Sequence, residues 1–592
     1  MKTKSITSII LLFFMCLAVF VFVGCDNDDR KKISFIANGN VYETVRTNGY
    51  ETITMPEDPV KKGYVFEGWY WDTEWQREFG ETAFEDEALL VNIKVYAKFV
   101  KQDPGSITNV TLSNSLKTIK AEQFAQYSSL QSITIPKSVT TIRADAFLGC
   151  DSLTRVDITD LDSWCKIEFE TPHSNPLFYA KNLYLNGELI TDLVIPDTVK
   201  IIHEYAFYGG SFKSLTISNS VTEINKEAFK KCTELESVTM GNSVKRVYYD
   251  NFKNCNAIKR VDITNIESWL NIYFSGFDAN PLNYAHKLYL NNNLVTDLVV
   301  PDSVQRIRDC AFKDYTDLKS VVIGNGVKQI DQEAFDGCTF LENVTLGNAV
   351  TEISFYAFRN TAIKDITIPD SVERVYRSAF GDCRFLESAT IGNSVKDLSD
   401  VFKNCYALTK LNITNLENWC NMEFMFWDSS PLYYADNLYL NGNLTTDLVI
   451  PNTVTKINKH AFYNCESLKS VTIPDSVKTI GEDAFSSCSS LEFVDLGNSL
   501  ASIDNDAFSP CSSLKDIIIP TTLTNIGSYS FSTYKSFNIF YLGTENALYA
   551  GYVKNYFKNS TMYYYSETQP TTEGNFWHFV DDKPTIWANS VQ

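Results

Sequence analysis

The stretch LQSITIPKSVTTIRADAFLGC, residues 130–150, is one complete unit of a pattern that fills most of the chain. Its SITIP segment alternates polar and apolar residues, which is typical of a strand with Ile133 and Ile135 facing inward. Pro136 cannot donate a ladder hydrogen bond, so it ends the pairing on that strand. The following SVTTI turns the chain, and the AF pair places Phe147 in the core. The unit therefore predicts one coil of a β-solenoid.

The unit recurs at a regular spacing. Successive phenylalanines of the AF position are 22 or 23 residues apart, except for three steps of 60 that each hold one 23-residue coil and 37 inserted residues. One coil cannot cover its own apolar side, so the coils must stack. The sequence predicts a mainly β solenoid of roughly 17 coils with three insertions. We also expect one continuous outward column of threonines, which includes Thr134, Thr216, Thr239, Thr345, Thr367, Thr390 and Thr472.

A cysteine follows the phenylalanine by three residues in most coils. Metal sites need several converging ligands, whereas this pattern supplies one cysteine per coil, with no C-x-x-C and five histidines in the whole chain. Disulfides between neighbouring coils, or a metal or redox role, remain alternatives. Tyrosine, glycine or threonine replaces the cysteine in other coils, so we favour a packing position. The ladder positions include Phe147, Cys150, Phe229, Cys232, Phe252, Cys255, Phe335, Cys338, Phe485 and Cys488.

The three insertions share a pattern of their own and span residues 157–196, 262–301 and 412–451. Each contains a tryptophan, then a polar residue before Pro-Leu, then an LYLN strand. Asn-Gly at 186–187 and at 441–442 is typical of a type I′ hairpin. Each insertion is therefore expected to form a short helical turn and a hairpin that leads back into the ladder.

Aromatic residues crowd these insertions, and two interpretations compete. Trp164, Trp269 and Trp419 recur at one position, which favours a small core inside each insertion over a ligand surface. Phe426 and Trp427 occur only in the third insertion. We therefore take Phe426 and Trp427 as the candidates for contact with a protein or glycan ligand.

The N-terminus indicates export from the cytoplasm. MKTKS supplies two lysines, an apolar run covers residues 6–23, and Gly24 precedes Cys25. This resembles a bacterial lipobox, which implies removal of residues 1–24 and diacylation of Cys25, although Phe22 replaces the usual leucine. An uncleaved signal anchor is the alternative. Both interpretations tether the protein to a membrane outside the cytoplasm, with 25–32 as a short tether.

Residues 33–101 read as strands punctuated by glycine and proline. Within them, MPEDPVKKGYVFEGWYWD and VYAKFV resemble the Listeria–Bacteroides (internalin B-type) repeat. The resemblance implies a small β-grasp-like module of bacterial surface proteins, which acts as a spacer or interaction module. Trp69, Tyr70 and Trp71 could form a sugar platform, but a core role in so small a module is favoured.

The repeats over residues 102–543 resemble the BspA-type (Treponema-type) leucine-rich repeats. That resemblance implies a surface protein associated with adhesion to host proteins or to other microbes. The aromatic segment 544–592 is expected to cap the last open coil.

Composition and motifs limit the other classes of function. The net charge of -20 argues against a nucleic-acid partner. We find no phosphate-binding loop, no H-E-x-x-H and no nucleophile elbow, and we predict no catalytic residue, metal site or cofactor. The sequence therefore favours a non-catalytic cell-surface lipoprotein that binds host or microbial proteins. The alternative is a glycan-binding component of a nutrient-capture system, which would use the aromatic residues of the insertions.

Overall fold

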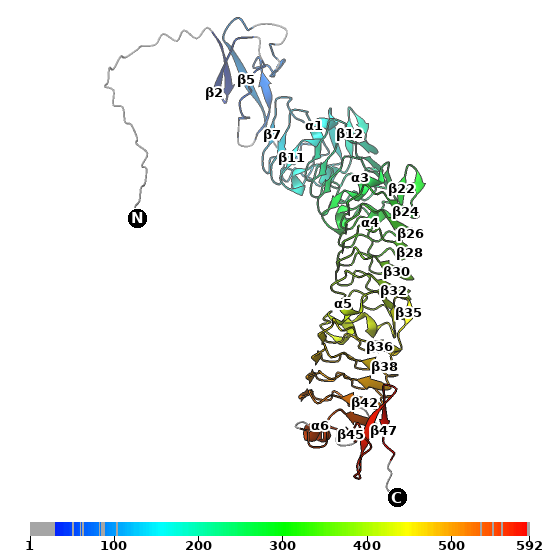
Figure 1. Ribbon diagram of the computed structural model, residues 1–592. Helices are drawn as coiled ribbons and strands as arrows, with labels where there is room; N and C mark the ends of the chain where they lie inside the picture. The colour runs from blue at the N-terminus through cyan, green and yellow to red at the C-terminus, as the bar shows by residue number, and fades with distance from the viewer. Residues whose placement is uncertain are drawn as a thin grey trace, which may run out of the picture. The chain divides into compact units, whose positions relative to one another are not determined.

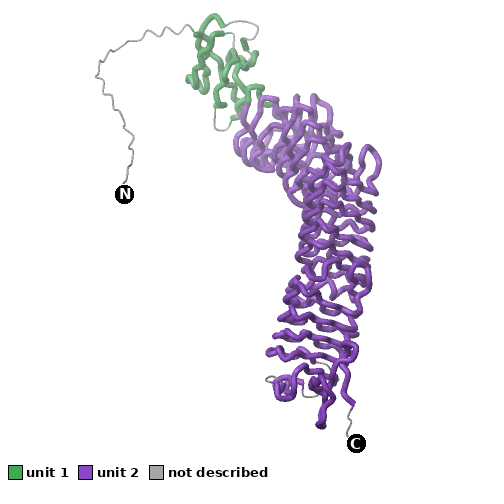
Figure 2. Tube along the Cα trace, in the orientation of Figure 1, with its two compact units in different colours: residues 1–103, 112–116 green, residues 104–111, 117–592 purple. Residues whose placement is uncertain are grey.

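The computed structural model divides into two compact units, residues 1–103 with 112–116 and residues 104–111 with 117–592 (Figure 2). The predicted signal peptide and Cys25 lie outside the described residues. The structure describes residues 30–588 except 50–51, 60, 62–63, 82, 85–88, 102–104, 533–535, 548–549 and 558–559.

The first unit is a five-stranded mixed sheet in the order β2-β1-β5-β3-β4. Trp69 is fully buried in its core and contacts the ring of Phe35 edge-on at 4.8 Å between centroids. Trp71 is partly buried against the same core. The favoured core role of these rings is therefore confirmed. The strands are β1 (Lys31–Ala37), β2 (Asn40–Thr47), β3 (Tyr64–Tyr70), β4 (Glu78–Phe79) and β5 (Ile93–Lys101).

The second unit is a solenoid in which each coil adds a parallel strand beside that of the preceding coil (Figure 1). In the unit quoted above, Ile133, Ile135 and Phe147 are buried, as their positions predict. The predicted mainly β solenoid is therefore confirmed.

Within the described residues, the main face of the solenoid is divided into four sheets. The first contains β6 (Asn109–Thr111), β8 (Ser132–Ile135), β10 (Arg155–Ile158), β12 (Leu183–Leu185) and β13 (Glu188–Leu189). The second contains β14 (Asp192–Val194), β16 (Ser214–Thr216), β18 (Ser237–Thr239), β20 (Arg260–Ile263), β22 (Leu288–Leu290) and β23 (Asn293–Leu294). The third contains β24 (Asp297–Val300), β26 (Ser320–Ile323), β28 (Asn343–Thr345), β30 (Asp365–Ile368), β32 (Ser388–Ile391), β33 (Lys410–Ile413), β34 (Asn437–Leu440) and β35 (Asn443–Leu444). The fourth contains β36 (Asp447–Val449), β38 (Ser470–Thr472), β40 (Phe493–Asp495), β42 (Asp516–Ile519), β44 (Asn538–Tyr541), β45 (Thr561–Tyr565), β46 (Phe576–Val580) and β47 (Lys583–Ile586).

A second ladder of two-residue strands runs beside the first and is divided in the same way. Its first sheet holds β7 (Thr118–Ile119), β9 (Thr141–Ile142) and β11 (Glu168–Phe169), and its second β15 (Ile201–Ile202), β17 (Glu223–Ile224), β19 (Arg246–Val247) and β21 (Tyr273–Phe274). The third holds β25 (Arg306–Ile307), β27 (Gln329–Ile330), β29 (Glu352–Ile353) and β31 (Arg374–Val375), and the fourth β37 (Lys456–Ile457), β39 (Thr479–Ile480), β41 (Ser502–Ile503) and β43 (Asn525–Ile526).

The insertions cause these breaks. β12 continues the ladder, but the next strand, β13, turns back antiparallel to β12 and occupies the edge where the following coil would pair. The hairpin therefore ends a sheet instead of leading back into the ladder, and β14 begins a new sheet. Asn186 and Gly187 have φ of 51° and 88°, as a type I′ turn requires.

The breaks also overturn the expected continuous column of threonines. Thr216 pairs with Thr239, and Thr367 pairs with Thr390, but these pairs belong to different sheets. Thr134 and Thr472 belong to two further sheets. The column is interrupted because the antiparallel hairpin of each insertion ends a sheet, so the threonines on either side of it are not on hydrogen-bonded neighbouring strands.

Each insertion begins with a one-turn helix, as predicted. The helices are capped by Asp160, Asn265 and Asn415, whose side chains accept backbone N–H bonds. The helical segments of the insertions are α1 (Leu161–Cys165), η1 (Pro172–Ser174), α2 (Leu177–Ala180), α3 (Ile266–Leu270), η2 (Phe277–Ala279), α4 (Leu282–Ala285), α5 (Leu416–Cys420), η3 (Trp427–Ser429) and η4 (Pro431–Tyr433).

At the C-terminal end of the solenoid, β45 and β46 extend the main ladder and β47 closes it as an antiparallel hairpin strand. Phe557, which follows α6 (Ala550–Tyr556), packs on Phe531, the last phenylalanine of the repeat series, with ring centroids 5.1 Å apart. No helix among the described residues has both the length and the apolar character needed to cross a bilayer.

The phenylalanines of neighbouring coils stack face to face inside the solenoid. Their ring centroids lie 5.0–5.8 Å apart with interplanar angles of 2–17°. The stacked series are Phe124–Phe147, Phe207–Phe229–Phe252, Phe312–Phe335–Phe358–Phe380–Phe402 and Phe462–Phe485–Phe508–Phe531.

The ladder cysteines have a specific partner. Eight of the nine ladder thiols donate to the carbonyl oxygen of the ladder phenylalanine one coil earlier, at Sγ–O distances of 3.0–3.3 Å, whereas Cys465 lies 3.6 Å from Ser467 Oγ. All twelve cysteines of the described residues are free and buried. The thiols that make this bond are Cys150, Cys232, Cys255, Cys338, Cys383, Cys405, Cys488 and Cys511.

Candidate binding site

The tryptophans of the three insertions are structural. Each is 1% exposed, and its indole Nε1–H donates to a backbone carbonyl of the next coil, 42 residues further along the chain. This confirms the favoured core role and removes these rings from the set of ligand contacts. The pairs are Trp164 with Ala206 at 3.0 Å, Trp269 with Ala311 at 3.1 Å, and Trp419 with Ala461 at 2.8 Å.

The polar residue before Pro-Leu supports the same joint in two of the insertions. The carboxamide of Asn175 donates to Ala206 O at 3.0 Å, and that of Asn280 donates to Cys310 O at 2.9 Å. In the third insertion this residue is Ser430, which is fully buried and whose Oγ has no hydrogen-bond partner in the described structure. The third insertion therefore departs from the other two at its attachment point.

The third insertion also differs at its surface. Met425, Phe426 and Trp427 form a consecutive exposed run, with 71%, 58% and 46% of their surfaces accessible. Large apolar side chains in sequence on a surface are costly unless a partner covers them. The two candidates taken from the sequence thus lie together on the surface, and Met425 joins them.

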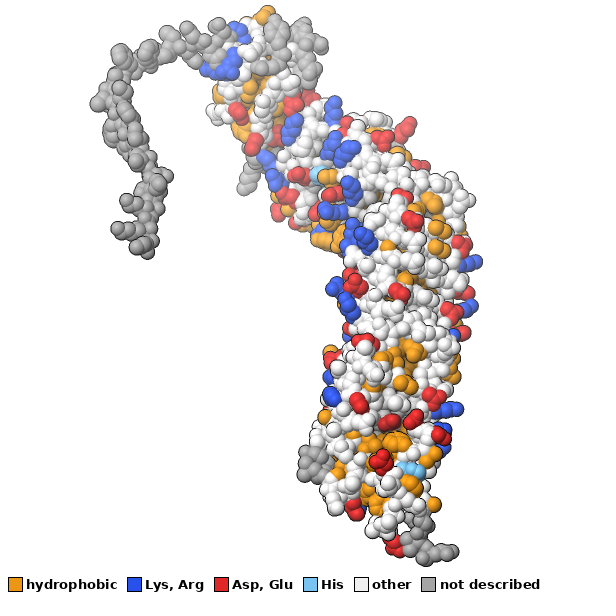
Figure 3. Space-filling model, viewed as in Figure 1, with side chains coloured by type: hydrophobic (Ala, Val, Ile, Leu, Met, Phe, Trp, Pro, Cys, Tyr) orange, Lys and Arg blue, Asp and Glu red, His pale blue; other side chains and the backbone are white. Residues whose placement is uncertain are grey.

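Several tyrosines surround Trp427, and we call this group the aromatic cluster. Trp427 contacts Tyr433 edge-on at 4.7 Å between centroids, and Tyr433 contacts Tyr434 at 4.8 Å. Tyr406 lies 5.8 Å from Tyr434, and Tyr463 lies 6.2 Å from Trp427. The cluster therefore joins the insertion to the coils on either side of it. Figure 3 shows that hydrophobic side chains gather in patches on the visible face of the solenoid.

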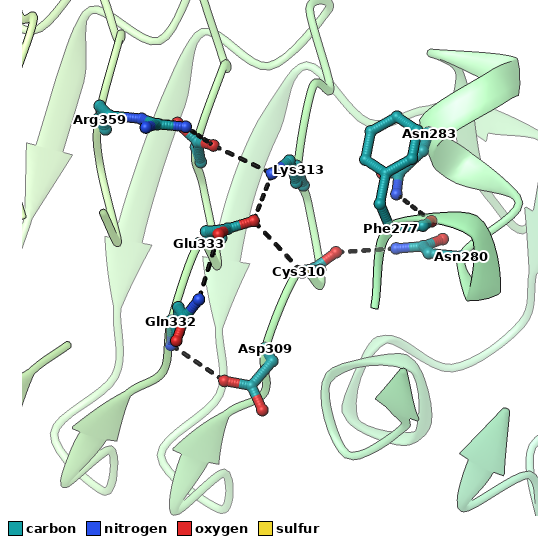
Figure 4. A network of polar contacts seen from close by, with 10 residues as sticks. Phe277, Asn280, Asn283, Asp309, Cys310, Lys313, Gln332, Glu333 and Arg359 are labelled. Carbon is teal, nitrogen blue, oxygen red and sulfur yellow. Dashed lines mark hydrogen bonds and ion pairs between the residues drawn. The ribbon is translucent and has the colours of Figure 1, made fainter. Parts of the chain in front are cut away.

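The second insertion keeps two of these rings, Phe277 and Tyr284, but the coils that follow it carry a charged network (Figure 4). Lys313, at the position that Tyr463 occupies after the third insertion, lies 5.6 Å from the ring centroid of Phe277. Its Nζ forms ion pairs with Glu333 and with Asp336, the latter at 3.3 Å. Arg359 pairs with the same Asp336 at 2.7 Å. The charges of this network satisfy one another, so it resembles a structural joint more than an open ligand surface.

A groove of about 1070 Å³ lies beside the exposed run. Its walls include Phe355 and Val375 on one side and Met425 and Lys459 on the other, with Lys396 between them. The groove thus spans coils on both sides of the third insertion and has Met425 in common with the exposed run.

A single missing residue accounts for the groove. In every other coil the valine or leucine of the turn precedes the ladder phenylalanine by eight residues, but Val395 precedes Phe402 by seven. The shortened coil cannot keep its register with β31, which is the last strand of its sheet. Residues 395–398, and 422–424 in the insertion, form no strand. At this turn one backbone bond, from Lys396 N–H to Glu373 O at 3.2 Å, is kept, while bonds such as Ser378 N–H to Asp400 O at 2.9 Å join the two coils elsewhere.

Ion pairs between coils line the groove. Lys396 pairs with Glu373 at 3.2 Å, and Lys459 pairs with Glu482 at 2.7 Å. Such exposed pairs contribute little to stability and can exchange partners with an incoming ligand. The groove therefore offers charges of both signs beside an apolar wall, which is suited to a protein surface.

The chemistry available to the ladder thiols is limited. Burial raises the pKa of Cys150 to about 12 and that of Cys465 to about 11, so these thiols remain protonated near neutral pH. Over the described ranges, no group of three or more His, Cys, Asp or Glu side chains is placed to hold a metal ion. The arrangement described here can bind a partner through shape, aromatic contact and charge.

Sequence reasoning missed the groove, Met425 and the tyrosines of the aromatic cluster. The seven-residue spacing from Val395 to Phe402 was the signal that could have located the groove, because it is shorter than the spacing in every other coil. No comparable signal identifies Tyr406, since its neighbours in space come from the insertion and from the following coil.

Two family models match the chain. The BspA type leucine rich repeat region matches residues 93–171, 180–293, 285–409 and 435–562, in six copies. The Listeria-Bacteroides repeat domain matches residues 32–98. Both resemblances found in the sequence are confirmed. No curated protein matches the chain.

Several solved structures are similar at low identity. A leucine-rich repeat protein from Bacteroides ovatus is 22% identical, with 79% of this chain and 95% of that chain covered and a TM-score of 0.28. A leucine rich cell surface protein from Faecalibacterium prausnitzii is 18% identical, with 80% and 96% covered and a TM-score of 0.21. The pneumococcal vaccine antigen PcpA is 14% identical, with 78% and 89% covered and a TM-score of 0.19. At these TM-scores the coils do not superpose over their whole length, and the likeness carries no functional information.

Proposed function

Because the chain belongs to the BspA-type leucine-rich repeat family, we propose that it is a non-catalytic binding protein of a bacterial surface that holds an extracellular protein partner. The partner is a host matrix protein or a protein of another microbe. The contact site is the third insertion, where the groove and the exposed run Met425–Phe426–Trp427 meet.

One observation carries this proposal. Met425 and Phe426, which join the groove to the exposed aromatic run, stand where the other two insertions have the polar or small residues 170–171 and 275–276. Interfaces draw most of their binding energy from a few aromatic anchors surrounded by polar groups. Trp427, with its tyrosine neighbours and the charged groove beside it, has this composition.

The anchor forms a second part of the proposal. Diacylation of Cys25 would tether the chain to the membrane and leave the repeats outside the cell. The Listeria–Bacteroides repeat that follows is consistent with a surface location. Incorporation of labelled palmitate that is lost in Cys25→Ser would support this anchor, and equal labelling of the variant would rule it out.

Glycan binding is the second candidate function, favoured by the exposed indole of Trp427 beside Tyr433 and Tyr463. Flat aromatic faces can pack against sugar rings as well as against protein. A glycan array and a panel of purified matrix proteins, both probed with the same chain, separate the two candidates.

The test is the double variant Phe426→Ala, Trp427→Ala, measured against any partner found in those two screens. Loss of two anchors is expected to weaken binding by at least tenfold with an unchanged melting temperature, since both rings are largely exposed. Phe340→Ala with Phe385→Ala is the matched control, because these rings are 62% and 61% exposed on other coils. Equal loss of binding in both double variants, or in neither, would contradict the proposed site.

A further inference from the structure

The first unit contains a pocket of about 500 Å³, which lies within the range of ~300–1,000 Å³ typical of small-ligand sites. Asn38 of the β1–β2 hairpin borders it on one side and Trp75 on another. Tyr96 and Phe99 of β5 form part of the wall. The pocket is built entirely within this unit and does not depend on the function proposed for the solenoid.

The charge of the pocket opposes that of the whole chain. Lys61 and Lys94 line it, and no acidic residue among those that the structure describes does, although the chain carries a net charge of -20. The ammonium of Lys61 lies 4.0 Å from the ring centroid of Tyr64 and 5.5 Å from that of Phe99. These rings orient the lysine without neutralising it, so its charge stays available to an anion.

Trp75 is held in an unusual backbone conformation at the edge of this pocket. Its φ is 63°, in the left-handed region that bulky residues rarely adopt. The preceding turn is fixed by Asp72, whose Oδ1 accepts from the N–H of Glu74 at 2.8 Å and from that of Gln76 at 3.3 Å. The indole is 36% exposed and contacts Tyr70 edge-on at 5.7 Å. Such strain is typical of positions with a functional role.

We propose that this pocket binds an acidic saccharide, that is, a short chain of sugar rings that carry carboxylates. The sugar rings pack against Trp75 and Tyr96, and the carboxylates lie near Lys61 and Lys94. Two lysines without an acidic partner in the pocket wall favour an anion. The aromatic walls favour rings over an acidic peptide, because flexible Asp and Glu side chains lose more conformational entropy on binding and have no flat face.

The experiment uses the full chain and isothermal titration with a trimer of galacturonic acid as the probe. The neutral trimer of galactose is the matched ligand, because it has the same ring without the carboxylate. Lys61→Gln with Lys94→Gln removes the charge of the pocket. Lys137→Gln with Lys328→Gln removes the same charge at two exposed positions of the solenoid. Trp75→Gly removes the ring while keeping a residue that accepts the left-handed backbone.

The acidic trimer is expected to bind, and the neutral trimer to bind at least tenfold more weakly. The Lys61→Gln, Lys94→Gln variant should lose about tenfold in affinity, since each lysine contributes a charge contact of modest size. The solenoid lysine variant should be unchanged, and Trp75→Gly should weaken the acidic trimer without abolishing its salt dependence. Equal binding of the two trimers, no binding of either, equal affinity of the two lysine variants, or tighter binding of an acidic peptide would overturn the proposal.

Discussion

At the level of single residues, the recurring cysteine is explained by size and by one weak hydrogen bond. The thiol fills a buried position and donates to the phenylalanine carbonyl of the preceding coil, for example from Cys338 to Phe312 at 3.1 Å. At this position in another coil, Thr361 makes a different bond, because its Oγ1 donates to Phe358 O of its own coil at 2.9 Å. Tyr315 instead reaches Val295 O with its hydroxyl group. The position therefore accepts a thiol, a hydroxyl-bearing side chain or, at Gly210, no side chain.

The state of these thiols can be measured. A chain that begins after Cys25 contains twelve cysteines, and we expect all twelve to react with a thiol reagent after unfolding without reductant. In the folded protein the ladder thiols should react slowly, because they are buried and burial raises the pKa of groups such as Cys150 and Cys511 to about 12. A count that is short by an even number after unfolding would instead indicate disulfides.

Among the structural elements, the insertions decide how the solenoid is joined. Each hairpin ends one sheet, and the tryptophan then binds the backbone of the next block, together with the asparagine before Pro-Leu in the first two insertions. In the first insertion, Ala206 O accepts from both Trp164 and Asn175, at 3.0 Å each. In the third insertion, Trp419 is the one side chain among the described residues that donates a hydrogen bond to Ala461 O.

This asymmetry predicts a difference between two equivalent variants. Trp419→Phe should leave a buried carbonyl without a donor and cost about 1–3 kcal/mol of unfolding free energy. Trp164→Phe should cost less, about 0.5–1.5 kcal/mol, because Asn175 still donates to the same carbonyl. Denaturant midpoints of the two variants, combined with hydrogen exchange of the coil that follows each insertion, provide the comparison. Equal costs would show that the carboxamide bond of Asn175 does not support the joint.

For the solenoid unit as a whole, one missing residue coincides with the groove at which we propose that a partner binds. A parallel ladder transmits register from coil to coil, so a short coil affects its neighbours and leaves a groove instead of a local kink. The groove then coincides with the insertion that carries the exposed Met425–Phe426–Trp427 run.

Restoring the missing residue tests this account. Insertion of one asparagine after Leu398 returns the spacing to eight residues, and we expect residues 397–398 to join β31 as a new strand and to reduce the groove. Binding of the protein partner should weaken by at least tenfold, while the melting temperature stays the same or rises. An asparagine inserted after Gly442, in the exposed hairpin turn, is the matched control. Hydrogen exchange at residues 396–399 reports whether the strand forms, and titration with the partner measures the affinity. A restored strand with an unchanged affinity would show that the groove does not contribute to binding.

The repeat pattern was sufficient to predict the mainly β solenoid, the buried phenylalanines and the hairpin turns, whereas the small module before the repeats was predicted from its own strand pattern and its resemblance to the Listeria–Bacteroides repeat. These features depend on alternation, on proline and Asn-Gly turns and on a period near 23 residues, all of which act over a short length of chain. The division into sheets, the Trp419–Ala461 joint and the groove at Val395–Phe402 were decided by the tertiary structure. They depend on which strand occupies a sheet edge and on how register passes between coils, which are relations between segments; the short spacing from Val395 to Phe402 marks the irregular coil in the sequence, but the groove that results forms only when the coils stack.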